Sequence, residues 1–323
     1  MKKEDLRIIY MGTPDFAVES LRALVEGGYQ VVGVITMPDK PAGRGHKIQF
    51  SPVKQYALDQ QIPLLQPEKL KDESFLADLK ALNADLQIVV AFRMLPAVVW
   101  DMPRLGTFNL HGSLLPQYRG AAPINWAVMN GDTETGATTF FLTHEIDTGK
   151  IILQERLPIA DTDDVATVHD AMMLLGGRLV TQTVDLILSD AVEAIPQESF
   201  YKDPTELRAA PKIFKDTCRI QWSQPATVVY NFVRGLSPYP AAWTELIAPD
   251  GTVSVLKVYQ TTKRIEAHNL PIGTIQTDAK SFVEVAVSDG FISLLSIQMP
   301  GKKRMPIDAF LNGFKLSTDY IVK

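Results

Sequence analysis

The sequence predicts an α/β fold, a Rossmann-like domain with a doubly wound, mostly parallel sheet, followed by a small β-barrel. The chain has 323 residues, more than the roughly 250 at which single hydrophobic cores stop growing. Apolar runs alternate with segments of helical period in the first part, and short strands joined by Asp-Gly turns fill the last part. We therefore expect domains at residues 1–190 and 209–323, joined by a linker at 191–208.

The first domain starts with apolar runs typical of buried strands. Three of them are short and rich in Ile and Val: Leu6–Met11, Val31–Thr36 and Leu86–Ala91. The residues between the first two include a set with helical spacing: Phe16, Val18, Leu21, Leu24 and Val25. Strands that alternate with helices predict a parallel sheet covered on both faces.

A longer helix is predicted from Val165 to Leu188. Apolar residues form one stripe along it: Val165, Val168, Met172, Leu175 and Leu179. After Ala191 this periodicity is lost, and the chain takes on the composition of a loop. The predicted linker rests on that change.

The last domain is predicted to hold closely spaced strands after a helix at Ala226–Arg234. Four strands are expected: Ala241–Ile247, Thr252–Thr262, Ser281–Val287 and Phe291–Ile297. Asp250-Gly251 and Asp289-Gly290 predict the hairpin turns. A mostly antiparallel, OB-like barrel fits this pattern, and that class of barrel binds oligonucleotides.

The composition is that of an ordinary soluble globular protein, with 46% apolar and 21% charged residues. The single Cys218 excludes an internal disulfide framework and a Cys-rich zinc site. The apolar run near the start is too short for a signal peptide or a membrane span. A cytoplasmic protein with no membrane partner is therefore predicted.

Charge is distributed unevenly along the chain, although the net charge is only −5. Residues 1–208 carry 19 basic and 28 acidic side chains, a balance of −9. Residues 209–323 carry 13 basic and 9 acidic side chains, a balance of +4. Such asymmetry is typical of a polyanion-binding appendage, but +4 also suits an ordinary solvated surface.

Two segments carry weaker signals for ligand binding. Gly12 follows the first strand, but the G-x-G-x-x-G fingerprint is absent, so a tight turn is favoured over a dinucleotide site. Neither helix nor strand is predicted for residues 38–47, where Lys40, Arg44 and Lys47 lie among glycines and prolines. Arg44 could present its fork to a phosphate, but an ordinary exposed loop is an equal alternative.

The strongest candidates for functional side chains are Asn109 and His111. Their spacing places both side chains on one face of a strand, at the strand end where open α/β sheets bind ligands. Further on, Asp147 stands before Thr148-Gly149. An aspartate there commonly bonds its own turn, yet it can also point inward. His144 lacks the further ligands that a metal requires, so no metal is expected.

These residues together resemble the signature of the folate-dependent formyltransferases: Asn109-x-His111, the loop Ser113-Leu114-Leu115-Pro116, and Asp147-Thr148-Gly149. Other stretches resemble the branch of that family that formylates methionine on initiator tRNA: Met11–Ala17, Pro38–Lys47, Arg119–Ile124, Ala210–Ile213, Ile220–Ser223, Val233–Pro240 and Gly301–Arg304. The resemblance implies transfer of a formyl group from 10-formyltetrahydrofolate to methionyl-initiator-tRNA, without a metal.

The resemblance also implies roles for individual residues. It assigns catalysis to Asn109, His111 and Asp147. It assigns folate binding to Ser113, Leu114, Leu115 and Pro116, and tRNA binding to Lys40, Arg44 and Lys47. The segment Val90–Pro96 departs from the family pattern, although Phe92 can still stack on the flat pterin ring.

The chemistry of formyl transfer agrees with these roles. A neutral amine attacks the formyl carbon, and negative charge develops on the formyl oxygen. Asn109 and His111 can donate to that oxygen as an oxyanion hole. Asp147 can orient His111 and help move the amine proton to the leaving nitrogen.

Other functions are less favoured. Relatives that formylate glycinamide ribonucleotide or an amino sugar would lack the Arg44 loop and the basic last domain. A tRNA-binding protein without catalysis would have no use for Asn109, His111 and Asp147 together. A dehydrogenase would need the glycine fingerprint.

Overall fold

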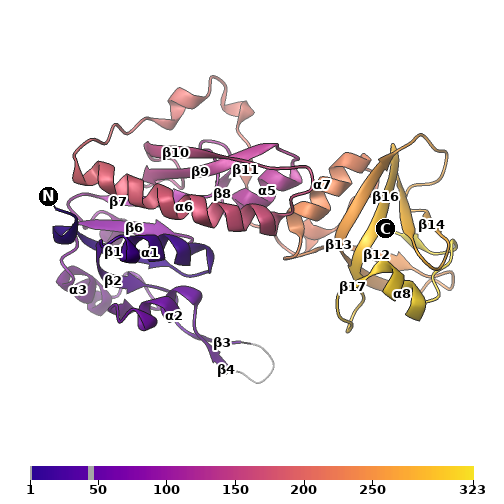
Figure 1. Cartoon of the computed structure of the whole chain (residues 1–323), viewed down its shortest axis with the longest axis horizontal. Coiled ribbons are helices and arrows are strands. Elements are labelled where there is room, and N and C mark those ends of the chain that lie inside the picture. Colours follow the sequence, from indigo (N-terminus) through magenta and orange to yellow (C-terminus); the bar gives the residue numbers. More distant parts are fainter. Residues whose placement is uncertain (1, 43–46) are drawn as a thin grey trace. The chain divides into compact units, whose positions relative to one another are not determined.

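The computed structural model describes residues 2–42 and 47–323 (Figure 1). Two compact units are present. The first comprises Met1–Pro123, Thr135–Pro158 and His169–Ala210, and the second comprises Ile124–Glu134, Ile159–Val168 and Pro211–Lys323. The chain thus enters the second unit three times. The sequence indicated a single crossing, through a linker at 191–208.

The sheet of the first unit has the order β10-β9-β7-β6-β1-β2-β5. Its strands are β1 (Arg7–Gly12), β2 (Gln30–Ile35), β5 (Leu64–Leu65), β6 (Leu86–Val90), β7 (Thr107–His111), β9 (Glu134–Phe141) and β10 (Ile151–Pro158). The pairs from β5 to β7 are parallel, whereas β7 and β9 are antiparallel. The chain leaves β1 toward β2 on one side and later fills β6 on the other. This reversal confirms the predicted doubly wound, mostly parallel sheet.

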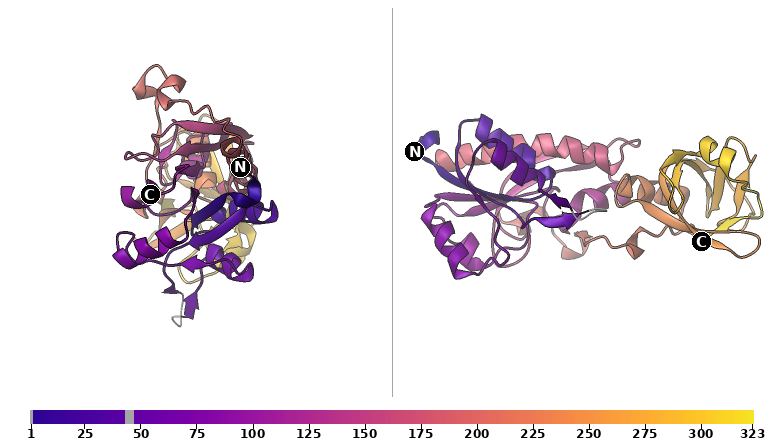
Figure 2. Two further views of the ribbon diagram at one scale, coloured as in Figure 1. Left: turned by 90° about the vertical axis from the view of Figure 1, so that its left-hand side faces the viewer. Right: turned by 90° about the horizontal axis from the view of Figure 1, so that it is seen from below.

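Helices cover both faces of this sheet. They are α1 (Phe16–Glu26), α2 (Pro52–Asp59), α3 (Glu73–Ala81), α4 (Ala97–Trp100) and α6 (Val165–Leu188). Phe75 of α3 and Val99 of α4 pack in one core with Val89 of β6. Figure 2 shows α1 and α6 side by side, and Ala23 of α1 approaches Gly177 of α6.

Among the residues that the structure describes, α6 alone is long and apolar enough to cross a membrane. The stripe predicted from the sequence is buried here, including Met172, Leu175 and Leu179. A Cβ atom on Gly176 would lie 2.6 Å from Leu110 Cδ2, so the helix packs closely on β7. The contacts of α6 in the first unit are therefore those of a core helix.

Two short strand pairs complete the first unit. β3 (Lys40–Ala42) and β4 (Lys47–Gln49) are antiparallel. This corrects the expectation that residues 38–47 contain no strand. A pair of three-residue strands has no core of its own and so leaves no apolar periodicity in the sequence. β8 (Arg119–Gly120) pairs in parallel with β11 (Ala209–Ala210).

The second unit is an antiparallel barrel-like sheet with the order β14-β15-β16-β13-β12-β18. Its strands are β12 (Ala242–Ile247), β13 (Val253–Ile265), β14 (Ile275–Thr277), β15 (Val283–Val287), β16 (Gly290–Gln298), β17 (Met305–Pro306) and β18 (Ile321–Val322). A bridge between Thr274 and Ile321 nearly closes the sheet. Hairpins join β12 to β13 and β15 to β16 at the two predicted Asp-Gly turns. The predicted small barrel is confirmed.

Helices α5 (Pro123–Met129), α7 (Ala226–Leu236) and α8 (Ile307–Gly313) accompany the barrel. The buried Arg234 of α7 explains why residues 159–168 join this unit. Its guanidinium donates to the carbonyl oxygens of Ala160, at 3.2 Å, and Asp163, at 2.7 Å. Asn125 of α5 donates to the carbonyl oxygen of Gly235 at 2.9 Å. These bonds attach two segments from the middle of the chain to α7.

Candidate active site

The carboxyl ends of β1, β6 and β7 lie beside one another in the first sheet. In the described part of the chain, four buried side-chain polar atoms have no hydrogen-bond partner, and three of them lie at these strand ends. They are Thr13 Oγ1, Arg93 Nε and Asn109 Oδ1. Buried polar atoms are nearly always hydrogen-bonded. Three exceptions at the edge where doubly wound sheets bind ligands indicate a site.

His111 ends β7 and faces Asp147. Both side chains are largely buried, at 7% and 11% exposed, and His111 Nδ1 lies 3.9 Å from Asp147 Oδ2. His111 Nε2 lies 2.8 Å from the carbonyl oxygen of Tyr118. A carbonyl only accepts, so Nε2 is the nitrogen that donates there. Nδ1 therefore faces the carboxylate, at a distance too long for a direct hydrogen bond.

Asp147 is held in an unusual backbone conformation. Its φ of 55° lies in the left-handed region, which aspartate tolerates better than most residues. Asp147 Oδ2 accepts a hydrogen bond from the backbone N–H of Gly120 at 3.0 Å. This bond to a distant segment supports the inward orientation that the sequence left open.

Gly149 explains the glycine of the Asp-Thr-Gly motif. A Cβ atom at this position would lie 1.6 Å from the carbonyl oxygen of Phe141. Any side chain would therefore push the loop away from β9. The backbone at Asp147 would move with it.

The predicted folate loop at residues 113–116 is packed firmly against its neighbours. The Ser113 side chain has no exposed surface, and its hydroxyl donates to the carbonyl oxygen of Gln117 at 2.6 Å. The N–H of Leu115 donates to Thr138 Oγ1 at 3.1 Å. Leu114 is half-buried. Within this loop, the Ser113 hydroxyl therefore acts as an internal brace.

Phe92 and Arg93 follow β6, where the sequence departs from the family pattern. Phe92 is half-buried and packs on the core that includes Val89. The Arg93 guanidinium donates to the carbonyl oxygens of Pro67 and Glu68, the latter at 2.8 Å. Partial burial lowers the pKa of Arg93 from its ordinary value. Arg93 thus joins the segment after β5 to the segment after β6, which the sequence did not predict.

The three residues predicted to bind tRNA are only partly described. Lys40 lies in β3 and Lys47 in β4. Arg44 lies outside the described residues. Elsewhere in the described chain, no group of three or more His, Cys, Asp or Glu side chains could hold a metal ion.

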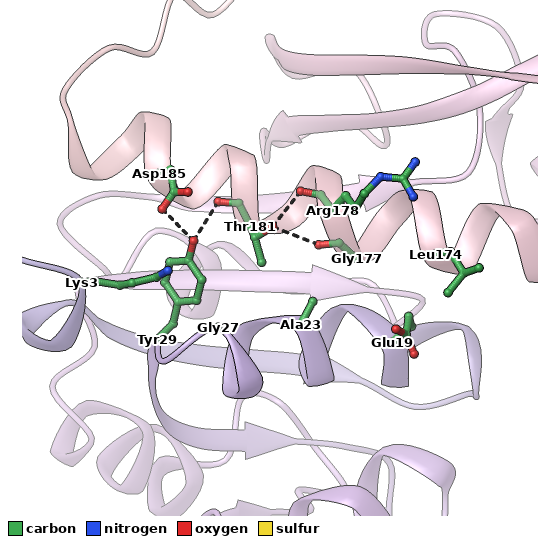
Figure 3. Close-up of a pocket in the computed structure, with 10 residues that line it drawn as sticks. All are labelled: Lys3, Glu19, Ala23, Gly27, Tyr29, Leu174, Gly177, Arg178, Thr181 and Asp185. Carbon is green, nitrogen blue, oxygen red and sulfur yellow. Dashed lines mark hydrogen bonds between the residues drawn. The ribbon is translucent and has the colours of Figure 1, made fainter.

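A separate groove lies between α1 and α6 and has a volume of about 500 Å³ (Figure 3). Tyr29 donates from its hydroxyl to Asp185 Oδ1 at 2.7 Å and lies under Lys3 Nζ. Burial and the nearby Asp185 carboxylate raise the pKa of Tyr29. The hydrogen bond to Asp185 joins α6 to the segment that leads into β2.

Comparison with known proteins identifies the family. A family model described as formyl transferase matches residues 6–184, and one described as the formyl transferase C-terminal domain matches residues 212–315. The chain belongs to the formyl transferase family. A relative from Parabacteroides distasonis, named methionyl-tRNA formyltransferase, is 73% identical over 323 residues, covering 100% of both chains.

Two solved structures share the fold of this chain at low sequence identity. One is WlaRD, a sugar 3N-formyl transferase, with a TM-score of 0.61 and 18% identity over 92% of this chain and 99% of that one. Another is HypX from Aquifex aeolicus, with a TM-score of 0.62 and 16% identity over 95% of this chain. This chain spans 48% of the HypX chain, about half its length.

Proposed function

We propose that this protein transfers the formyl group of 10-formyltetrahydrofolate to the α-amino group of methionine carried by initiator tRNA. The observation that carries the proposal is the 73% identity, over the full chain, to a relative named methionyl-tRNA formyltransferase. The unpartnered polar atoms beside His111 support a ligand site at the same sheet edge. The cytoplasm, where initiator tRNA is charged, is the proposed location.

Asn109 and His111 would stabilise the transition state. As the amine attacks the formyl carbon, the formyl oxygen becomes negative and needs hydrogen-bond donors. The amide of Asn109 can donate through Nδ2, while its unpartnered Oδ1 can accept from the attacking amine. His111 donates from Nε2 to Tyr118, so Nδ1 can donate to the formyl oxygen only when both ring nitrogens carry a proton.

Asp147 would support His111 and handle the proton. Its carboxylate lies 3.9 Å from Nδ1 and faces that side of the imidazole ring. The same carboxylate can accept the amine proton, directly or through water, and pass it to the leaving nitrogen of the folate. A free α-amino group has a pKa of about 8, so no strong base is needed.

Binding of the two substrates is assigned to different residues. The 113–116 loop and Phe92 are proposed to contact the folate, with Leu114 and the ring of Phe92 presenting apolar surface. Lys40, Arg44 and Lys47 are proposed to contact tRNA phosphates. We retain residues 1–190 as the proposed catalytic domain, 191–208 as the linker and 209–323, with their balance of +4, as the tRNA-binding domain.

The proposal is tested by one transfer assay with 10-formyltetrahydrofolate and three acceptors: methionyl-tRNA, glycinamide ribonucleotide and free methionine. We expect rapid formylation of methionyl-tRNA and little of the other two, because they cannot use the tRNA contacts. Preferred formylation of glycinamide ribonucleotide would contradict the proposal and would indicate that glycinamide ribonucleotide is the acceptor. Tight tRNA binding without transfer to any acceptor would indicate a binding protein.

A further inference from the structure

Gln197 is a fully buried side chain in the segment that the sequence predicted to be a linker. It begins a short 3-10 helix, Gln197–Phe200, and is 0% exposed. Its Nε2 donates to the carbonyl oxygens of Asp147, at 2.9 Å, and Gly149, at 2.8 Å. Its Oε1 accepts two bonds from Arg119, at 3.0 Å from Nε and 2.6 Å from a terminal nitrogen. Both ends of the amide are therefore engaged.

Arg119 determines which way this amide points. A guanidinium has five donors and no acceptor, so only the oxygen of Gln197 can face it. The amide nitrogen must then face the two carbonyl oxygens of the 147–149 loop. A flipped amide would put a donor against Arg119 and an acceptor against Asp147, losing four hydrogen bonds.

The residue next to Arg119 holds the other end of Asp147. The N–H of Gly120 donates to Asp147 Oδ2 at 3.0 Å. Gln197 bonds the main-chain carbonyl of Asp147, and Gly120 bonds its carboxylate. Together they fix a residue whose φ of 55° is sparsely populated for a non-glycine residue.

Gln197 is itself anchored by the preceding residues. Ile195 pairs with Ile151 at the start of β10 through two backbone hydrogen bonds of 2.8 Å. The side chain of Gln197 therefore reaches the 147–149 loop from a fixed backbone.

We propose that Gln197 is a positioning residue for formyl transfer. Oriented by Arg119, its amide fixes the backbone at Asp147 so that the carboxylate stays opposite His111 Nδ1. The inference rests on the proposed function, because it assigns Gln197 an effect only through Asp147. Gln197 itself need not touch either substrate.

The test is a double-mutant cycle of Gln197→Ala and Asp147→Ala, read by single-turnover formyl transfer to methionyl-tRNA. Misplacing a catalytic group by about 1 Å can slow a reaction by about 10²-fold, so we expect a loss of that order for Gln197→Ala. The KM values for tRNA and folate should change by less than about twofold. In the Asp147→Ala background, Gln197→Ala should cause no further loss, since the residue it positions is gone.

Gln87→Ala is the matched control. Gln87 is also buried, at 1% exposed, and its Oε1 accepts from Thr107 within the sheet of the same unit. It should lower the melting temperature as Gln197→Ala does but leave the transfer rate within about twofold. An equal rate loss for Gln87→Ala would assign the effect of Gln197 to general destabilisation.

Two further variants secure the result. Gln197→Glu keeps an acceptor for Arg119 but turns carboxylate oxygen toward two carbonyl oxygens, so it should be about as slow as Gln197→Ala. If Gln197→Ala fails to fold, Arg119→Lys replaces it, because this change removes the two hydrogen bonds from the guanidinium to Gln197 Oε1. Arg119→Lys should cause a smaller loss of transfer rate. That loss should disappear in the Asp147→Ala background.

Two results would refute the roles of Gln197 and Asp147 separately. Losses that multiply in the double variant would show that Gln197 acts independently of Asp147 and would refute its positioning role. Normal transfer by Asp147→Ala alone would instead refute the role of Asp147 in the proposed function.

Discussion

Each unit contains an arginine that hydrogen-bonds to an amide side chain. The two arginine–amide pairs fix segments of different function. In the first unit, Arg119 orients Gln197, which grips the carbonyl oxygens beside Asp147. In the second, Arg234 donates to Asn231 Oδ1 at 2.8 Å and grips the carbonyl oxygens of Ala160 and Asp163 directly.

The difference lies in what the gripped segment carries. The 147–149 loop presents a carboxylate to His111, so a small displacement there changes the geometry of the site. The segment near Ala160 carries none of the proposed catalytic residues. Similar hydrogen-bonding chemistry should therefore affect the reaction rate in one unit and folding in the other.

The largest expected effect is on the rate of formyl transfer, at the site that the Arg119–Gln197 pair supports. His111→Ala or Asn109→Ala should slow transfer by about 10²–10³-fold, the usual loss for one oxyanion donor, while tRNA affinity stays near that of the wild type. Steady-state kinetics and tRNA binding measure the two quantities. His169→Ala, on α6, serves as the control. Normal turnover with weakened tRNA binding would contradict the assignment.

The second effect is on the stability of the protein, at the Arg234–Asn231 pair. Arg234→Ala leaves buried acceptors at Asn231, Ala160 and Asp163 without their donor, and each such group costs about 1–3 kcal/mol. Chemical denaturation should therefore show a clearly lower free energy of unfolding, with kcat unchanged where the protein remains folded. A large fall in kcat with unchanged stability would show that the Arg234–Asn231 pair also supports catalysis, and would contradict the proposed difference between the two pairs.

A third effect concerns tRNA binding and not the proposed catalytic site. If Arg44 contacts one phosphate, Arg44→Ala should lower the slope of log affinity against log salt by about 0.7–0.9. Lys71→Ala, an exposed basic residue outside the proposed contact loop, is the control. An unchanged slope for Arg44→Ala would refute the phosphate contact.

The smallest effect is expected at the α1–α6 groove. Tyr29→Phe removes the hydrogen bond to Asp185 and should cost about 1 kcal/mol of stability, without changing transfer. Because the pKa of Tyr29 is raised on folding, its contribution is present below a pH of about 10 and is lost as the pH rises further. Stability curves of wild type and Tyr29→Phe should therefore converge at high pH. Parallel curves would contradict this.

Local patterns in the sequence were sufficient to predict the sheet and the barrel. Short apolar runs predicted β1, β2 and β6, and Asp-Gly turns predicted two hairpins. The spacing of Asn109 and His111 placed them at the end of β7, because strand periodicity is a local property.

Features that depend on distant contacts were not predictable in this way. Gln197 lies 78 residues from Arg119, and its segment has no periodicity, so the sequence suggested only a linker. The interleaving of the two units depends likewise on Arg234, which bonds a carbonyl 71 residues away. A buried amide with both ends bonded leaves no local pattern of its own.

His111, Asn109 and Asp147 are proposed to carry out formyl transfer to methionyl-tRNA. The most direct measurement is single-turnover transfer from 10-formyltetrahydrofolate by wild type and Asp147→Asn, with tRNA affinity determined on the same preparations. We predict that Asp147→Asn binds methionyl-tRNA normally but transfers the formyl group about 10²-fold more slowly or worse. Transfer at the wild-type rate would refute a catalytic role for Asp147.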